Sequence, residues 1–255
     1  MNIDYLDLIS FEPLYLEKTG SIISPLLKDI NKIGIITYNF YISLMLLTPQ
    51  QYLTSIKGKS YDDESLSPNL YDLLEDNSDL QKIFVNAFAF FIKEKIEYSK
   101  EFNMFFTYNG MVDEENTLLP TGVIKKENFD MIRDIILQRN HIVRNNTNSG
   151  KIVKKKSLEI YNKILKGREE LNKVKNKKQD SEMELGNLIS ALASNHNSLN
   201  ILNIWDITVF QLYDQFERQI NKNVFEVQGN AIAFNGSSAA PDFKYTNWYK
   251  ITNNN

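Results

Sequence analysis

A helical spacing of apolar residues recurs along most of this 255-residue chain. Between residues 25 and 47, apolar side chains return at alternating steps of four and three, which draws one stripe along a helix of 3.6 residues per turn. Similar stripes follow residues 78, 126 and 181, the first of them predicting a helix to about residue 99, and the clearest stripe contains Trp205, Val209, Leu212 and Phe216. We therefore expect a chain that folds mainly into helices, each burying one face.

Two short runs interrupt this helical pattern. Residues 103–108 (NMFFTY) and 118–124 (LLPTGVI) are rich in aromatic or β-branched side chains, and Asn109-Gly110 and an acidic turn separate them. This arrangement predicts a β-hairpin with a long loop, in which Pro120 restricts the second strand to an edge. The expected fold class is mainly α with a small β-hairpin at about residues 102–124, an α+β fold.

The segment NNTNSG at 145–150 is the clearest linker in the chain. It predicts a helical domain with the hairpin over residues 1–146, followed by a linker and a Lys-rich helix over residues 147–180. A C-terminal helical module with an aromatic tail is expected over residues 181–255. A chain of this length is near the upper limit for a single core, so a division into more than one unit is reasonable.

No catalytic motif is visible in the sequence. The chain has no Cys and only two His, His141 and His196, and it lacks phosphate-binding loops and metalloprotease or hydrolase signatures. The acidic clusters 62–64 and 113–115 lack the spacing of a calcium loop, and we interpret them as solvated turns. We expect a protein that is not an enzyme, with no catalytic residues, no cofactor and no metal. A hydrolase or nuclease built from scattered acids has no supporting spacing.

The N-terminal residues do not resemble a targeting signal. They carry acids where a signal peptide needs basic residues. The longest apolar stretch, Ile33–Leu47, is interrupted by polar residues and is too short to cross a bilayer of about 30 Å. We therefore expect no membrane partner.

Charge is unevenly distributed along the chain. Segment 151–178 holds ten Lys and one Arg against three Glu, a balance of +8 within a chain of net charge −3. An exposed Lys-rich helix or connector is the favoured interpretation, because nucleic-acid binders usually add aromatic residues or more Arg. Nucleic-acid contact and binding to an acidic protein remain open. The candidate contacts to a polyanion are Lys154, Lys155, Lys156, Lys175, Lys177 and Lys178.

The C-terminal tail concentrates aromatic side chains, which gain energy only by docking into a pocket. Two interpretations are open: a strap packed on the core of its own chain, or a short peptide that docks on a neighbouring subunit. The residues concerned are Phe243, Tyr245, Trp248 and Tyr249.

Two segments resemble a known family. Residues 26–53 (LLKDINKIGIITYNFYISLMLLTPQQYL) and 203–226 (NIWDITVFQLYDQFERQINKNVFE), with the terminal NWYK (247–250), resemble segments of tail-assembly proteins in phages and prophages of low-GC Gram-positive bacteria. In particular, they are similar to tail assembly chaperones, which precede the tape-measure protein. The resemblance covers about a fifth of the chain and includes no catalytic motif.

This resemblance implies a non-enzymatic assembly factor in the cytoplasm of the bacterial host. Such a chaperone binds the helical tape measure and recruits tail-tube subunits through apolar helix faces and exposed segments. The chain is long for this family and segment 151–178 has no counterpart, which leaves a structural component of the virion as an alternative. Other phage structural proteins or a second copy are the expected partners, and a nucleic-acid-associated protein is a further alternative. The residues expected to be contact or core residues are Trp205, Leu212, Phe216 and Trp248.

Overall fold

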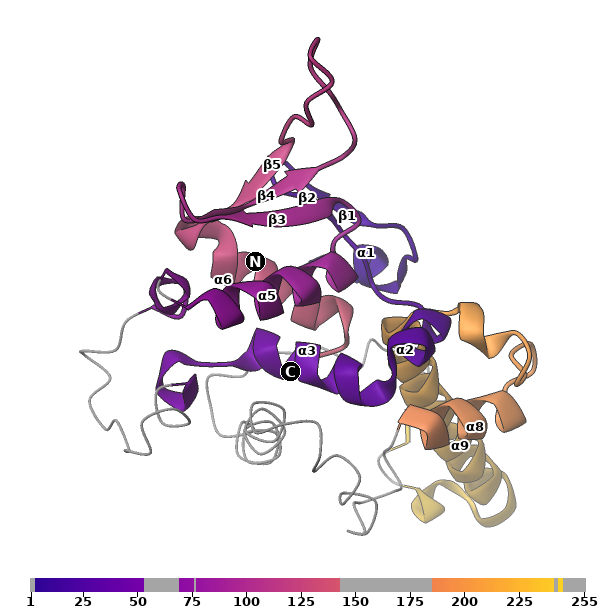
Figure 1. Cartoon of the computed structure of the whole chain (residues 1–255). Coiled ribbons are helices and arrows are strands. Elements are labelled where there is room, and N and C mark those ends of the chain that lie inside the picture. Colours follow the sequence, from indigo (N-terminus) through magenta and orange to yellow (C-terminus); the bar gives the residue numbers. More distant parts are fainter. Residues whose placement is uncertain (1–2, 53–68, 76, 143–184, 241–242, 245–255) are drawn as a thin grey trace, which may run out of the picture. The chain divides into compact units, whose positions relative to one another are not determined.

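The computed structural model describes residues 3–52, 69–75, 77–142, 185–240 and 243–244 (Figure 1). The chain divides into an N-terminal unit of residues 1–25 and 29–177 and a C-terminal unit of residues 26–28 and 178–255. Within the described residues, the strands form two small antiparallel sheets in the N-terminal unit, and helices make up most of the regular structure. The predicted fold class, mainly α within an α+β fold, is confirmed.

The helices of the N-terminal unit follow the predicted stripes with one important break. The helix expected over residues 25–47 is two helices, because Gly34 adopts a φ of 82° that residues with a side chain rarely adopt. Its first part, α2, begins at Leu27 in the C-terminal unit and continues into the N-terminal one. The bounds are α1 (Tyr5–Ile9), α2 (Leu27–Ile33), α3 (Ile35–Leu46), the short 3-10 helix η2 (Asp72–Leu74), α5 (Ser78–Phe91) and α6 (Lys126–Arg139).

The predicted hairpin is present, and it belongs to a larger sheet. Strand β4 (Met104–Tyr108) pairs with β5 (Gly122–Ile124), with Phe105 opposite Ile124, as the pattern of residues 103–124 predicted. Strand β3 (Lys95–Ser99) completes the order β3-β4-β5. The sequence placed residues 95–99 in the helix that starts near residue 78, and this was wrong because that helix ends at Phe91. Figure 1 shows α5 and α6 beneath the sheet.

A second hairpin, β1 (Leu14–Leu16) with β2 (Gly20–Ile22), was not predicted and braces the first. The turn between its strands lies against β5: the Val123 N–H donates to the Lys18 carbonyl at 2.8 Å. The Thr107 hydroxyl donates to the Thr19 carbonyl at 2.6 Å. A β-carbon at Gly122 would lie 2.8 Å from the Lys18 backbone, so this close approach requires glycine. These contacts therefore hold the turn between β1 and β2 against β4 and β5.

Aromatic rings form the core of the N-terminal unit. The Phe129 ring on α6 lies 5.2 Å from Phe84 and 5.9 Å from Phe88, both on α5, measured between ring centroids. Phe88 in turn meets Phe105 of β4 edge to face at 5.3 Å. All four phenylalanines are fully buried. Such pairs add about 0.5–1.5 kcal/mol each beyond the burial of their area, so this cluster holds both helices against the sheet.

Buried Arg139, the last residue of α6, fixes the N-terminal segment. Its guanidinium donates to the backbone carbonyls of Asp7 at 2.9 Å, Ser10 at 3.3 Å and Glu12 at 2.8 Å. Burial lowers the pKa of Arg139, and the nearby Asp7 charge opposes that shift. These bonds satisfy backbone carbonyls in α1 and just after its end, which would otherwise need hydrogen bonds from water. Arg133 makes equivalent bonds to carbonyls at the end of α3.

The C-terminal unit is built on two helices, α8 (Leu185–Asn195) and α9 (Val209–Asn235). The short 3-10 helices η5 (Ile204–Asp206) and η6 (Ser237–Ala239) flank α9. Thr208 and Gln211 form a reciprocal capping box, so α9 begins after Trp205. Leu27 is attached to this unit by a hydrogen bond: its backbone N–H donates to the Ile207 carbonyl at 3.0 Å. The buried apolar residues include Leu188, Ile189, Leu192, Ile204, Val209, Phe210 and Leu212.

Replacing Phe129 by alanine should remove the ring on which the aromatic core of the N-terminal unit converges. We expect the F129A substitution to lower the free energy of unfolding by about 3–5 kcal/mol, the usual cost of deleting a buried phenylalanine ring. Urea unfolding followed by far-UV circular dichroism measures this change. The matched control is F11A, because Phe11 is 66% exposed in the same unit; it should change stability by no more than about 0.5 kcal/mol. Equal effects of both substitutions would contradict the described core.

Candidate protein-protein interfaces

The structure separates the residues that the sequence grouped as one contact face. Leu212 is fully buried and belongs to the core of the C-terminal unit. Trp205 is half-buried in η5, and its indole N–H donates to the Ile201 carbonyl at 2.9 Å. Phe216 is half-buried on α9 and faces α8. Of these three residues, Trp205 and Phe216 have surface available for a partner.

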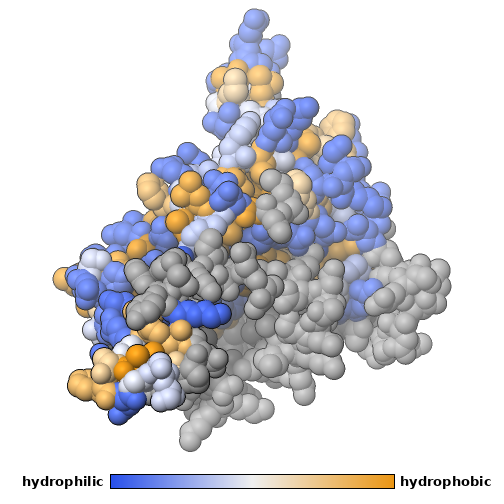
Figure 2. Space-filling view, turned by 180° about the vertical axis from the view of Figure 1, so that it is seen from behind, coloured by the Kyte–Doolittle hydropathy of each residue, from blue (hydrophilic) through white to orange (hydrophobic). Residues whose placement is uncertain are grey.

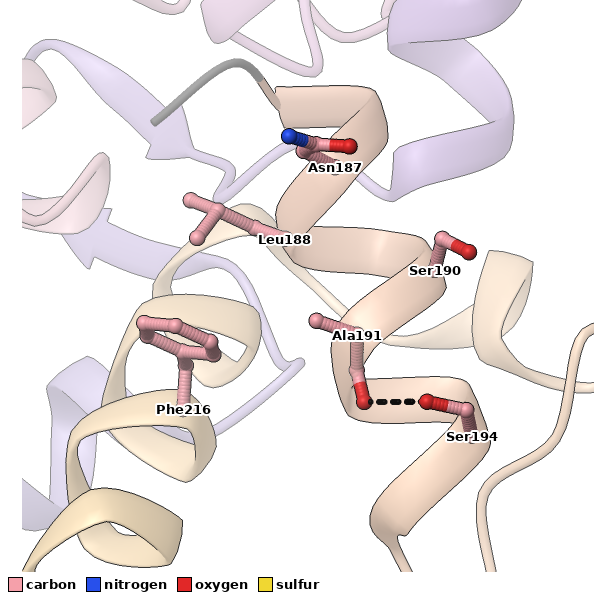
Figure 3. A pocket seen from close by; sticks show the side chains of 6 residues that line it. All are labelled: Asn187, Leu188, Ser190, Ala191, Ser194 and Phe216. Atoms are coloured by element: carbon pink, nitrogen blue, oxygen red, sulfur yellow. Dashed lines mark hydrogen bonds between the residues drawn. The ribbon is translucent and has the colours of Figure 1, made fainter. Parts of the chain in front are cut away.

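An open pocket of about 300 Å³ lies between α8 and α9. Figure 3 shows Phe216 of α9 and Leu188 and Ala191 of α8 around the same space. The Ser194 hydroxyl on its rim donates to the Ala191 carbonyl at 2.9 Å. Asn187 and Ser190 complete the lining. The lining offers apolar contact area together with amide and hydroxyl groups.

The first aromatic residue of the C-terminal tail packs on its own chain. The Phe243 ring stacks on Phe225 of α9, with 5.1 Å between centroids and 28° between planes. A β-carbon at Gly229 would lie 3.8 Å from the same ring, so Phe243 covers this face of α9. The other predicted tail residues, Tyr245, Trp248 and Tyr249, lie outside the described residues.

The predicted polyanion contacts also lie outside the described residues. They belong to residues 143–184, together with the predicted linker at 145–150 and the Lys-rich helix. The hypotheses of nucleic-acid binding and of binding to an acidic protein therefore stay predictions from sequence.

The second half of α9 presents an apolar stripe that the sequence analysis did not identify. All the fully buried residues of this helix lie in its first two turns. Beyond them, apolar side chains line one face as far as the helix end. We call this stripe the α9 seam, formed by Ile220, Val224, Val227, Ala231 and Phe234. Figure 2, which views the molecule from behind, shows apolar side chains at the surface of this unit at the lower left.

A second exposed surface lies between β4 and β5. Residues 109–121 form an extended loop, which we call the arm, that projects beyond β4 and β5 at the top of Figure 1. Val112 bridges Leu118 across the arm, and the Leu119 N–H donates to the Met111 carbonyl at 2.8 Å. These four apolar side chains are between 40 and 59% exposed. The arm therefore carries apolar surface away from the core of its unit.

The tip of the arm is acidic and closed by its own hydrogen bonds. The Asp113 carboxylate accepts from the backbone N–H groups of Glu115 at 2.9 Å and Thr117 at 2.8 Å. Glu114 and Glu115 are exposed, as expected for the solvated turn predicted there. In Figure 2 the arm is hydrophilic at its tip and apolar just beneath it.

The described residues contain no group of three or more His, Asp or Glu side chains placed to hold a metal ion. The His196 ring accepts backbone hydrogen bonds at Nδ1 from Ser198 and Leu199, which fixes a turn after α8. His141 follows the end of α6 with a φ of 60°. Among the described helices, none has the length and hydropathy needed to span a bilayer.

Comparison with known families concerns the C-terminal unit. Residues 175–253 match a family model described as the YomV second domain. The match includes α8 and α9, and it points to a phage- or prophage-type protein family. Neither a curated protein nor a solved structure matches the chain.

The burial of Leu212 predicts a structural role. The L212A substitution should lower the free energy of unfolding by about 2–5 kcal/mol, because it leaves a cavity between the helices. Tryptophan fluorescence, excited selectively over that of the 13 tyrosines, follows this unit, since both tryptophans of the chain, Trp205 and Trp248, belong to it. L202A is the matched control, because Leu202 is 85% exposed in the same unit. If the two variants unfold at the same denaturant concentration, Leu212 is not a core residue.

Proposed function

We propose that this chain is a non-enzymatic tail-assembly protein of a phage or prophage. It works by binding other structural proteins of the tail, either the tape-measure protein or the tail tube, in the cytoplasm of the bacterial host. The observation that carries the proposal is the arm, which displays Met111, Val112, Leu118 and Leu119 on a projecting loop closed by the Val112–Leu118 bridge. The family match of residues 175–253 supports the phage context.

The arm has the physical properties of a docking element. Contiguous exposed apolar surface is costly in water and commonly marks a protein interaction site. The strands at its base are held in register by the buried residues Phe105 and Ile124, which face each other across β4 and β5. Because the base is already ordered, a partner loses little binding energy to fixing the arm.

The acidic tip adds selectivity to this apolar surface. Charges at Asp113, Glu114 and Glu115 repel the tip of another arm, which discourages edge-to-edge pairing between copies. The same charges favour a partner whose apolar groove is bordered by basic side chains. This combination fits a different structural protein better than a second arm.

Affinity purification tests the role of the arm directly. The tagged chain would be expressed in cells that produce all the tail proteins, and captured proteins would be quantified by mass spectrometry relative to the bait. The double substitution V112S and L118S should lower capture of tail proteins at least tenfold, about 1.4 kcal/mol of binding free energy. The matched control L6S and F11S removes two exposed apolar residues from the same unit and should leave capture unchanged. Unchanged capture by the arm variant would contradict the proposal.

Purified particles distinguish an assembly factor from a virion component, the alternative that the sequence leaves open. A factor that acts only during assembly should be present in lysates and depleted from mature particles. Quantitative mass spectrometry of both fractions, with the tail-tube protein as the reference, measures the ratio. A fixed number of copies per particle would instead favour the structural virion component.

A further inference from the structure

We propose that two copies of this chain associate through the α9 seam as a short two-stranded coiled coil. The seam residues return at steps of four, three, four and three, which is the heptad spacing of helices that pack side by side. In this register Val224 and Ala231 occupy a positions, and d positions are filled by Ile220, Val227 and Phe234.

Four of the five seam residues, Ile220, Val224, Val227 and Phe234, have exposed apolar side chains. Ile220 is 47% exposed, Val224 49%, Val227 69% and Phe234 86%, whereas Ala231 is half-buried. Single apolar side chains on a surface are ordinary, whereas a row of them at heptad spacing is typical of a helix that packs on another helix.

The chain's own tail covers a different face of the same helix. Phe243 lies on Phe225 and Gly229, which occupy b and f positions of the heptad register. Positions b and f point away from the a and d stripe, because each residue turns the helix by about 100°. The described part of the tail therefore leaves the seam open.

The residues beside the seam favour a second copy as the partner. The flanking e and g positions select partners in coiled coils through their charges. Here every one of them is an uncharged amide: Asn221, Asn223, Gln228, Asn230 and Asn235. Two identical seams consequently meet without repulsion, and amide side chains both donate and accept hydrogen bonds with their own kind.

The charged residues of this helix half are already paired on its outer side. Lys222 and Glu226 occupy f and c positions and form an ion pair at 3.8 Å between Nζ and Oε1. They neither attract nor exclude a helix at the seam. A seam with apolar a and d positions and neutral flanks offers nothing that would select an oppositely charged partner, and it fits its own copy.

The length of the seam sets the expected strength. It spans about 21 Å of helix, or two heptads. An interface of this length buries less surface area than a permanently associated dimer usually does. The association is therefore concentration-dependent, in the micromolar range. It is separate from the contacts proposed for the arm, which lies in the other unit.

Sedimentation of the full chain tests this proposal. Between 5 and 500 µM the average mass should rise from the 29.7 kDa of the monomer towards twice that value. V227E places like charges in the centre of the seam and should weaken association at least tenfold. Q219E is the matched control, because it adds the same charge at an outer c position. A wild-type chain that stays monomeric throughout, or a V227E variant that associates like the control, would overturn the proposal.

Cysteine cross-linking keeps the proposal testable even if V227E loses helix content. The chain has no cysteine, so each single substitution reports on one position. In a parallel pair Val227 faces its own counterpart, whereas in an antiparallel pair it faces Val224 or Ala231 of the second copy. In a parallel pair V227C should therefore form a disulfide-linked dimer at least tenfold faster than Q219C under the same oxidising conditions. In an antiparallel pair a mixture of V227C chains with V224C or A231C chains should do so instead. If none of these combinations cross-links faster than Q219C, the proposal is overturned.

Discussion

The packing of Phe105 against Phe88 and Phe129 is the interaction on which the arm depends. A two-stranded hairpin is marginally stable in water by itself. Here the core-facing residues of β4, Phe105 and Thr107, are fixed by an aromatic cluster and by a hydrogen bond to the Thr19 carbonyl. The arm therefore continues from a strand whose register and orientation are fixed without a partner.

This arrangement separates two tasks along the chain. The buried aromatic residues of the N-terminal unit hold the sheet from which the arm projects. In α9 the buried residues lie in the first two turns, so most of the α9 seam stays exposed. We infer that the C-terminal unit brings two copies together while the arm of each copy binds another protein, so that pairing strengthens attachment to a repeated partner.

Helical periodicity made much of the fold predictable, and its failures have physical causes. The stripe of α6 was recognised because a buried helix face leaves a regular pattern over three turns. Strand β3 was missed because only Ile96 is buried on it, between the exposed Lys95 and Glu97, and one buried residue makes no pattern. The break at Gly34 was missed because the apolar stripe continues across it. The β1–β2 hairpin depends on contacts with β5 that are distant in sequence.

The candidate surfaces were less predictable than the fold. Apolar spacing singled out Leu212 and Phe216 without showing that Leu212 is buried, because the same pattern describes a core face and a contact face. The heptad steps from Ile220 to Phe234 were readable, and the amides beside them were a usable signal. Met111 and Val112 precede the acidic tip and Leu118 and Leu119 follow it, but turn residues and Pro120 led to the interpretation of a loop. Which of these apolar residues stay exposed depends on the packing of the whole unit, which the local sequence pattern does not show.

The most direct test of the account is site-specific photo-cross-linking from Met111 in cells that assemble the tail. A photoreactive residue at this position on the arm would be activated during assembly, and the adducts would be identified by mass spectrometry. We expect adducts with a tail structural protein that are absent when the same group stands at Phe11, an exposed position elsewhere in the unit. No adduct from position 111 above that background would contradict the account.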